Sequence, residues 1–316
     1  MVRYIIQRLA AMILTLFIVL SIGFIAMRLM PGNVYENNEL PIVVMEALRE
    51  KAGLNEPILV QYGIFLKNIL LNNDWGTSIS VSPGVPVFSV MALRIPISMQ
   101  INIASLLFAL PIGLLLGISA ALLQNRIPDY IISFVVVLFI SVPSFVFAAL
   151  MQFYLAFRFS WFPIIYQPTA SFTGYAHSLV LPVIALMLSP IATITRYLRG
   201  ELIESLSSEY MLLARTKGLT KFEATVKHAF RNAFLPLANI ILPMFAWVLG
   251  GSLVVERVFG IPGVGSLMVD AITTRDHTMA VAVLIFYSAV YLVTILLVDI
   301  SYVIIDPRVR LGRSRE

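Results

Sequence analysis

The sequence predicts an all-α membrane protein with six transmembrane helices. The 316-residue chain is 59% hydrophobic and only 12% charged, about half the charged share of soluble domains. Its charged residues leave several uninterrupted apolar runs, each long enough to cross a bilayer. Such a chain cannot bury its apolar surface in a water-soluble globule. It contains no cysteine, which excludes disulfides, thiolate metal sites and cysteine nucleophiles.

Runs without charged residues locate the crossings, because a helix needs roughly 20 apolar residues to span the hydrocarbon layer. The six expected crossings lie within Leu9–Met27, Ile95–Asn125, Tyr130–Phe157, Leu179–Thr195, Asn232–Val255 and Met279–Val298. The first run is longer than the apolar core of a signal peptide, and no small-x-small cleavage site follows it. We therefore expect the first run to remain as a membrane helix.

The basic residues set the predicted orientation, because Lys and Arg gather in cytoplasmic segments. With both termini inside (N-in/C-in), the cytoplasmic side holds most of the 22 basic residues, including those from Arg196 to Arg231 and from Arg308 to Arg315. The net charge of +5 therefore follows from topology, and we expect no nucleic-acid partner.

These runs divide the chain into four parts. Residues 1–30 are an N-terminal tail with the first transmembrane helix, and residues 31–94 are an extracytoplasmic segment. Residues 95–306 are the transmembrane core, with a cytoplasmic loop at residues 199–236, and residues 307–316 are a cytoplasmic tail.

The extracytoplasmic segment is too long for a simple loop. Apolar residues recur at helical spacing in Met45–Lys51 and Ile58–Leu71, so we expect a small external subdomain of short helices. Within the crossings, prolines predict kinks, which are either hinges or ordinary features of membrane helices. These prolines are Pro111, Pro143, Pro182, Pro190 and Pro243.

The cytoplasmic loop contains a charged stretch, Glu209–Pro236, with the polarity of a soluble surface. Gly218 suits the left-handed position that ends a helix. Thr220 and Glu223 have the spacing of a capping box, so a second helix should begin at Lys221. We predict two helices joined by a sharp turn and protruding into the cytoplasm.

The first of these helices carries an apolar stripe. The second should end near Phe234, with Pro236 near the start of the fifth crossing. The stripe consists of Leu202, Ile203, Leu206, Tyr210 and Leu213. One interpretation is a solvated basic loop that fixes topology and touches anionic lipid headgroups. A docking element for a cytoplasmic partner also explains the glycine turn, the capping box and the stripe.

The charged stretch resembles the EAA loop of ABC importer permeases, with the residues Glu209-Tyr210-x3-Ala214-Arg215-x-Lys217-Gly218 and then Leu235-Pro236. Tyrosine replaces the first alanine of that motif. Other stretches are similar to the oligopeptide/dipeptide/nickel permease family, and Pro57–Trp75 is similar to its B-type subunit. The stretches similar to the family are Arg94-Ile95-Pro96 with Pro111 to Ala121, Gly250 to Glu256, Pro262 to Gly265, and Asp306-Pro307-Arg308. The likeness covers nearly the whole chain.

The resemblance implies a type I ABC importer permease fold in a bacterial or archaeal cytoplasmic membrane, with the charged stretch coupled to an ATPase. The coupling residues would be Glu209, Tyr210, Ala214, Arg215, Lys217 and Gly218. Implied partners are a second related permease subunit, two cytoplasmic ABC ATPase subunits, an extracytoplasmic substrate-binding protein and membrane lipid. The implied cargo is oligopeptides or dipeptides, with nickel, metal chelates or glutathione as alternatives within the family.

The chain lacks the G-x4-G-K-[ST] phosphate loop, so we expect ATP and Mg to bind only to partner ATPase subunits. We expect no catalytic residue, no cofactor and no metal site in this chain, because its three histidines form no ligand pattern. An ion-gradient-driven secondary transporter is the alternative. It would be expected to show inverted repeats or intramembrane acids, and the best such acid, Asp299, fits a packing role near a helix end.

Polar residues inside the crossings give candidates for the pathway or gate. They are Gln100, Asn102, Ser141, Ser144, Asn239 and Glu256. Such residues either line a solvated cavity or join neighbouring helices by hydrogen bonds, and we interpret most of them in the second way. Glu256 lies at the outer end of the fifth crossing, where it either lines the substrate entry or is an interface charge.

Overall fold

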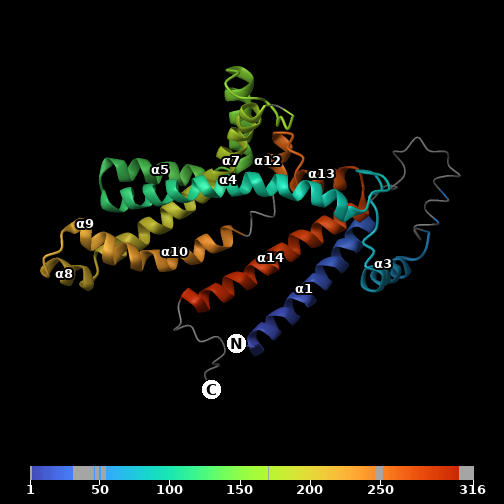
Figure 1. The fold of residues 1–316 in the computed structure, drawn as a ribbon, viewed down its shortest axis with the longest axis horizontal. Coiled ribbons are helices and arrows are strands. Elements are labelled where there is room, and N and C mark those ends of the chain that lie inside the picture. The colour runs from blue at the N-terminus through green and yellow to red at the C-terminus, as the bar shows by residue number, and fades with distance from the viewer. Residues whose placement is uncertain are drawn as a thin grey trace. The chain divides into compact units, whose positions relative to one another are not determined.

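A computed structural model describes residues 2–30, 46, 50, 55–169, 171–245 and 252–305. The regular elements of these residues are helices, apart from an isolated bridge between Thr77 and Pro86, which confirms the predicted all-α class (Figure 1). The elements are α1 (Val2–Leu29), α3 (Ile58–Asn72), α4 (Val87–Leu122), α5 (Ile127–Ser141), α6 (Ser144–Met151), the π-helix η1 (Gln152–Arg158), α7 (Phe172–Leu206), α8 (Glu209–Thr216), α9 (Lys221–Ala224), the π-helix η2 (Thr225–Ala229), α10 (Phe230–Met244), α12 (Leu253–Val258), α13 (Val264–Thr273) and α14 (His277–Ile305).

Four helices of the described chain, α1, α4, α7 and α14, are long and apolar enough to cross a membrane. A fifth span is added if α5 and the α6–η1 segment form one crossing, although these two are bent by 99°. The predicted crossing over Tyr130–Phe157 is thus broken at Pro143, one of the prolines at which a kink was predicted. Val142 precedes Pro143 and adopts extended backbone (φ −98°, ψ 124°), as residues before proline prefer, and this ends α5.

The predicted fifth crossing, Asn232–Val255, coincides with α10 only as far as Met244, and residues 246–251 lie outside the described residues. The other prolines do not interrupt their helices. Pro111 lies within α4, Pro182 and Pro190 within α7, and Pro236 and Pro243 within α10. In the segment predicted to be extracytoplasmic, the predicted helix at Ile58–Leu71 is confirmed as α3, whereas Met45–Lys51 lies largely outside the described residues.

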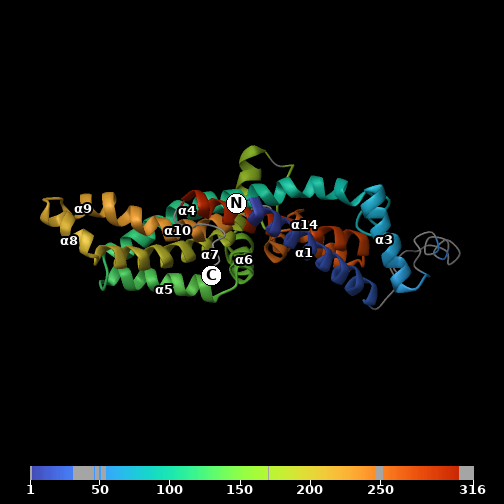
Figure 2. The same cartoon turned by 90° about the horizontal axis from the view of Figure 1, so that it is seen from below.

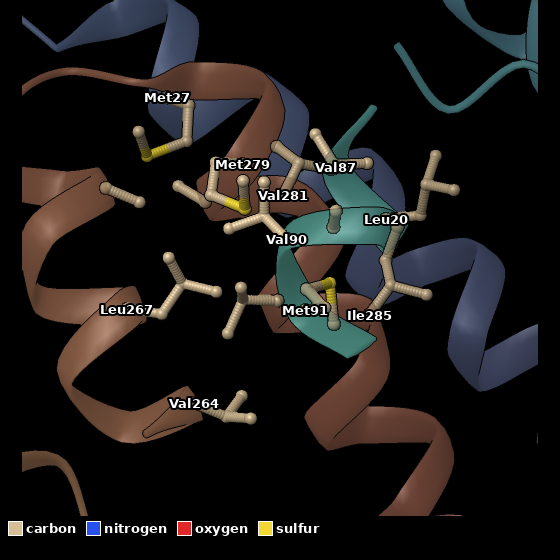
Figure 3. Close-up of a cluster of buried hydrophobic side chains, with 14 of the residues drawn as sticks. Leu20, Met27, Val87, Val90, Met91, Val264, Leu267, Met279, Val281 and Ile285 are labelled. Atoms are coloured by element: carbon tan, nitrogen blue, oxygen red, sulfur yellow. The ribbon is translucent and has the colours of Figure 1, made fainter. Parts of the chain in front are cut away.

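The chain divides into two compact units, Met1–Ile97 with Pro262–Val293 (unit 1) and Ser98–Ile261 with Thr294–Glu316 (unit 2). The core of unit 1 joins α1, α13 and the first parts of α4 and α14 (Figure 3). Its labelled side chains are Leu20, Met27, Val87, Val90, Met91, Val264, Leu267, Met279, Val281 and Ile285. Gly23 allows α1 to approach α14 closely, since a Cβ there would lie 2.5 Å from a methyl carbon of Leu284.

A buried carboxylate in unit 1 holds the irregular segment before α4. Asp276 Oδ2 accepts hydrogen bonds from the N–H groups of Ile79, Ser80 and Val81 at 2.9, 3.0 and 3.1 Å. The Ser78 hydroxyl donates to the same oxygen. Because Oδ1 accepts from a backbone N–H in the first turn of α14, Asp276 also caps that helix.

In unit 2, α7 is the central helix and packs against α5, α6, α10 and α12. Figure 2 shows α5, α7 and α10 running alongside one another. Small residues bring α4 close to α7, because a Cβ at Gly113 or Gly117 would lie 2.9 Å from Ile194 or 3.0 Å from Leu198. The loop predicted at 199–236 begins within the last part of α7, which ends at Leu206, and it finishes within the first part of α10, which begins at Phe230.

Candidate functional site

The charged stretch folds as a helix–turn–helix at one end of unit 2 (Figures 1 and 2). We call residues 209–229, which are α8, the turn, α9 and η2, the α8–α9 hairpin. The helix before it is broken, because α7 ends at Leu206 and α8 begins at Glu209. At the break, both the N–H and the hydroxyl of Ser208 donate to the carbonyl of Ser205. The predicted apolar stripe therefore spans two helices instead of one.

The turn is a Schellman motif, as the glycine predicts. Gly218 has φ +92°, and its N–H donates to the carbonyl of Arg215 at 3.0 Å. The next N–H, of Leu219, donates to the carbonyl of Ala214 at 3.3 Å. No atom lies within 4 Å of the place where a Cβ on Gly218 would sit. The glycine is therefore required by its backbone conformation and not by lack of space.

The second helix begins at Lys221 with the predicted capping box. The Thr220 N–H donates to Glu223 Oε2 at 3.0 Å, and the Glu223 N–H donates to Thr220 Oγ1 at 3.2 Å. The Thr220 hydroxyl also donates to Oε2, at 2.8 Å. The hydrogen bond from the Thr220 N–H lowers the pKa of the Glu223 carboxyl most, and the bond from the Thr220 hydroxyl lowers it further. Glu223 is therefore ionised at neutral pH and holds the turn.

The second helix does not end near Phe234 as predicted. It continues through η2 and α10 as far as Met244, and Pro236 lies inside it. The π-helical turn of η2 absorbs an extra residue in the helical repeat without ending the helix. One continuous helical segment therefore links the hairpin to the apolar helix that packs on α7.

The hairpin has an inner and an outer face. Met211 and Ala214 are buried and belong to the same apolar cluster as Leu202 of α7. On the outer face, the side chains of Leu212 and Leu213 are 66% and 56% exposed. Two adjacent leucines exposed on a polar protrusion form an apolar patch that nothing in the described chain covers.

The structure separates the six predicted coupling residues. Ala214 faces the apolar cluster, whereas the others are exposed: Glu209, Tyr210, Arg215, Lys217 and Gly218. We define the hairpin surface as the exposed side chains of Glu209, Leu212, Leu213, Arg215 and Lys217. The sequence interpretation missed Leu212, because this residue lies off the predicted apolar stripe.

Unit 2 also contains a cavity of about 570 Å³. Six of its lining residues are polar: Asn102, Ser105, Ser144, Ser189, Thr193 and Ser252. The hydroxyls of Ser105 and Thr193 donate to carbonyls one turn earlier in their own helices, at 2.8 and 2.9 Å. Each of these two bonds lies within one helix and does not join neighbouring helices. The cavity wall is thus weakly polar and partly apolar.

The predicted pathway residues whose side chains are described lie at several places in unit 2. Asn102 and Ser144 line this cavity, whereas Ser141 lines a separate groove between α5 and α7. Gln100 Oε1 accepts a hydrogen bond from the hydroxyl of Tyr175 at 2.6 Å. The side chain of Asn239 lies outside the described residues.

Glu256 is buried, with 2% of its surface exposed. Its Oε1 accepts hydrogen bonds from the Ser98 hydroxyl at 2.7 Å and from the Ser252 N–H at 3.3 Å. It therefore ties α12 to α4 within unit 2. Both alternatives from the sequence, a residue that lines the substrate entry and an interface charge, stay predictions.

An ion pair that the sequence did not predict connects α5 to α7. The guanidinium of Arg199 donates to both carboxylate oxygens of Asp129, at 2.6 and 2.8 Å. Asp129 is 1% exposed and also accepts from the N–H of Asn125 at 3.0 Å. The pair fixes the turn before α5 to the last third of α7, close in sequence to the start of the hairpin.

The sequence matches two family profiles. Residues 113–311 match the family described as binding-protein-dependent transport system inner membrane component. Residues 1–99 match the N-terminal region of binding-protein-dependent transport system membrane components.

Curated proteins are similar to this chain along its full length. The dipeptide transport system permease protein DppB of Lactococcus lactis is 41% identical over 311 residues, covering 98% of this chain and 100% of the relative. DppB of Bacillus subtilis is 34% identical over 99% of this chain and 100% of the relative. The oligopeptide transport system permease protein OppB of Escherichia coli is 34% identical over 98% of this chain and 100% of the relative.

Proposed function

The chain belongs to the family of binding-protein-dependent transport system inner membrane components, and from this premise we propose that it is a permease subunit of an ATP-driven peptide importer. The relatives are named for dipeptide and oligopeptide transport, which supports a peptide cargo here. Energy would come from two ATPase subunits, and cargo from an extracytoplasmic binding protein. A second, related permease would complete the pathway.

The α8–α9 hairpin is the observation that carries this proposal, and we assign it to the ATPase contact. Its exposed leucines supply apolar surface that loses water on docking, and Arg215 and Lys217 supply charge beside them. The hairpin is attached to the bundle at both ends, through the cluster with α7 and through the continuous helix into α10. A displacement of the hairpin by the ATPase would therefore reach both helices.

Transport requires that the ATPase contact differ between two states of the bundle, because a ligand shifts an equilibrium only by its differential affinity. We propose six crossings with both termini in the cytoplasm, so that the hairpin faces the ATPase. The distribution of basic residues supports this orientation. The cavity of unit 2 is our candidate for part of the pathway, since its weakly polar wall suits ligands that vary in side chain.

The leucines of the hairpin surface give the test. In the assembled transporter, we expect Leu212→Ser with Leu213→Ser to weaken association with the ATPase subunits at least about tenfold, because burying a leucine contributes about 1.5–3 kcal/mol. ATPase retained on the affinity-purified permease should fall accordingly, and peptide-dependent ATP hydrolysis should fall with it.

Leu71→Ser is the matched control, because Leu71 of α3 is also an exposed leucine, at 75%, but lies outside the hairpin. It should retain the ATPase as the unaltered protein does. If the double variant and the control retain equal amounts of ATPase, with both proteins folded, the hairpin surface is not part of the ATPase contact.

A further inference from the structure

Unit 1 contains a cavity of about 190 Å³ where the end of α1, the helix α3 and the beginning of α14 meet. Phe24, Met27, Phe65 and Val281 form its apolar walls. Its polar lining includes Arg28, Gln61, Asn68, Asp74 and His277, and Asp74 Oδ1 accepts a hydrogen bond from the Gly76 N–H at 2.8 Å. This volume is far larger than a single water molecule needs. The cavity belongs to neither the hairpin nor the cavity of unit 2.

The imidazole of His277 is buried in this cavity without a hydrogen bond. Only 7% of His277 is exposed, and neither ring nitrogen has a hydrogen-bond partner among the described residues. A neutral imidazole offers one donor and one acceptor. Burying both groups without partners is costly, so the site favours a ligand that forms hydrogen bonds with them.

Arg28 brings a permanent positive charge to the same cavity. Its Cζ lies 5.3 Å from the centroid of the Phe24 ring, a cation–π contact that positions the guanidinium. The planar fork of the guanidinium matches a phosphate or carboxylate, and such bonds are stronger than neutral ones. The cavity thus combines an anion-binding group, a donor–acceptor pair and apolar walls.

The position of the cavity along the helices identifies the source of the anion. Arg28 lies at the end of the apolar helix α1, and His277 begins the apolar helix α14, both of which are long enough to cross a membrane. Such ends lie at the level of lipid headgroups. Beside the cavity, α1 exposes the apolar side chains of Ile22, Ile25 and Leu29, a surface suited to acyl chains.

We propose that this cavity binds the headgroup of an anionic phospholipid whose phosphate is esterified to a hydroxyl-bearing group, such as phosphatidylglycerol. The phosphate diester accepts hydrogen bonds from Arg28. A headgroup hydroxyl pairs with His277, and the acyl chains lie along the exposed face of α1. Bound lipid would join α1, α3 and α14 at one membrane face.

The experiment measures lipid retained by the purified full-length chain. The protein is equilibrated with mixed detergent micelles of phosphatidylglycerol and phosphatidylcholine in equal amounts, and bound lipid is counted by native mass spectrometry. We expect selective retention of phosphatidylglycerol. Arg28→Gln should reduce that selectivity about tenfold, since a charge-assisted bond is lost. His277→Phe, which fills the site with an apolar ring, should reduce it as well.

Lys67→Gln is the control, because Lys67 is an exposed cation of α3 that does not line the cavity. Its selectivity should equal that of the unaltered chain. Arg28→Lys retains the charge without the fork and covers the case in which Arg28→Gln does not fold. Equal retention of both lipids by the unaltered chain overturns the proposal. So does full displacement of phosphatidylglycerol by millimolar inorganic phosphate, which would indicate a site for free anions.

Discussion

Gly218 is the residue on which the geometry of the hairpin depends most directly. A β-branched side chain in its left-handed conformation costs about 1–2 kcal/mol, while asparagine tolerates that conformation better. We predict that Gly218→Val accelerates amide hydrogen exchange in residues 209–224 and abolishes substrate-stimulated ATP hydrolysis in the assembled transporter. Gly218→Asn should have a smaller effect, and exchange elsewhere in the bundle should not change.

Gly200→Val serves as the control for this prediction. Gly200 lies inside α7, where an added Cβ also meets nothing within 4 Å, but its φ is not in the left-handed region. It should leave exchange in the hairpin unchanged. Similar exchange in both valine variants would show that the turn does not depend on the glycine conformation.

The residues whose structural roles could be predicted from the sequence form hydrogen bonds with near neighbours in the chain. Gly218, Thr220 and Glu223 form bonds within a few positions, so spacing alone reveals them. Asp276 Oδ2, in contrast, accepts its bonds from residues almost 200 positions earlier, the Ser78 hydroxyl among them at a separation of 198. No local pattern identifies such a partner, and for the same reason the polar cavity of unit 1 was not predicted.

At the scale of helices, the presence of a helix was easier to predict than the residues at which it ends. Long apolar runs located α1, α4, α7 and α14, because hydrophobicity over about 20 residues is a strong signal. The break at Pro143 was predicted as a kink, whereas the break at Ser207 was missed, and an end near Phe234 was predicted where the helix continues. Proline is compatible with either outcome in a membrane helix, since neighbouring groups can compensate for the missing N–H.

The contact between α5 and α7 rests in part on the pair Asp129–Arg199. Arg199→Gln should destabilise unit 2 more than Asp129→Asn, because it leaves a carboxylate 2% exposed without its cation, whereas the Arg199 side chain is 31% exposed. The double variant should lose less stability than the sum of the two losses, with a coupling of about 0.5–3 kcal/mol. Denaturant unfolding in detergent measures all four proteins. Additive losses would show that the two side chains do not stabilise each other.

At the scale of the whole molecule, composition predicted the class and the charged stretch predicted the family. Both predictions are confirmed, by the helical structure and by matches that span the chain. The number of crossings could not be settled by counting apolar runs, because Pro143 breaks one run and α10 is shorter than a full span. The cargo depends on cavities assembled from distant helices and on partner proteins, which local sequence patterns do not encode.

The absence of a phosphate loop in the sequence and the exposed hairpin lead to one central claim, that transport by this chain is driven by ATPase subunits through the hairpin. Peptide uptake into proteoliposomes tests this claim most directly. The chain is reconstituted with its partner permease, ATPases and binding protein, and labelled peptide is measured with and without ATP. We predict uptake that requires ATP and the ATPases and is unaffected by a protonophore. Uptake by the chain without ATPases, driven by a proton or sodium gradient, would contradict the account.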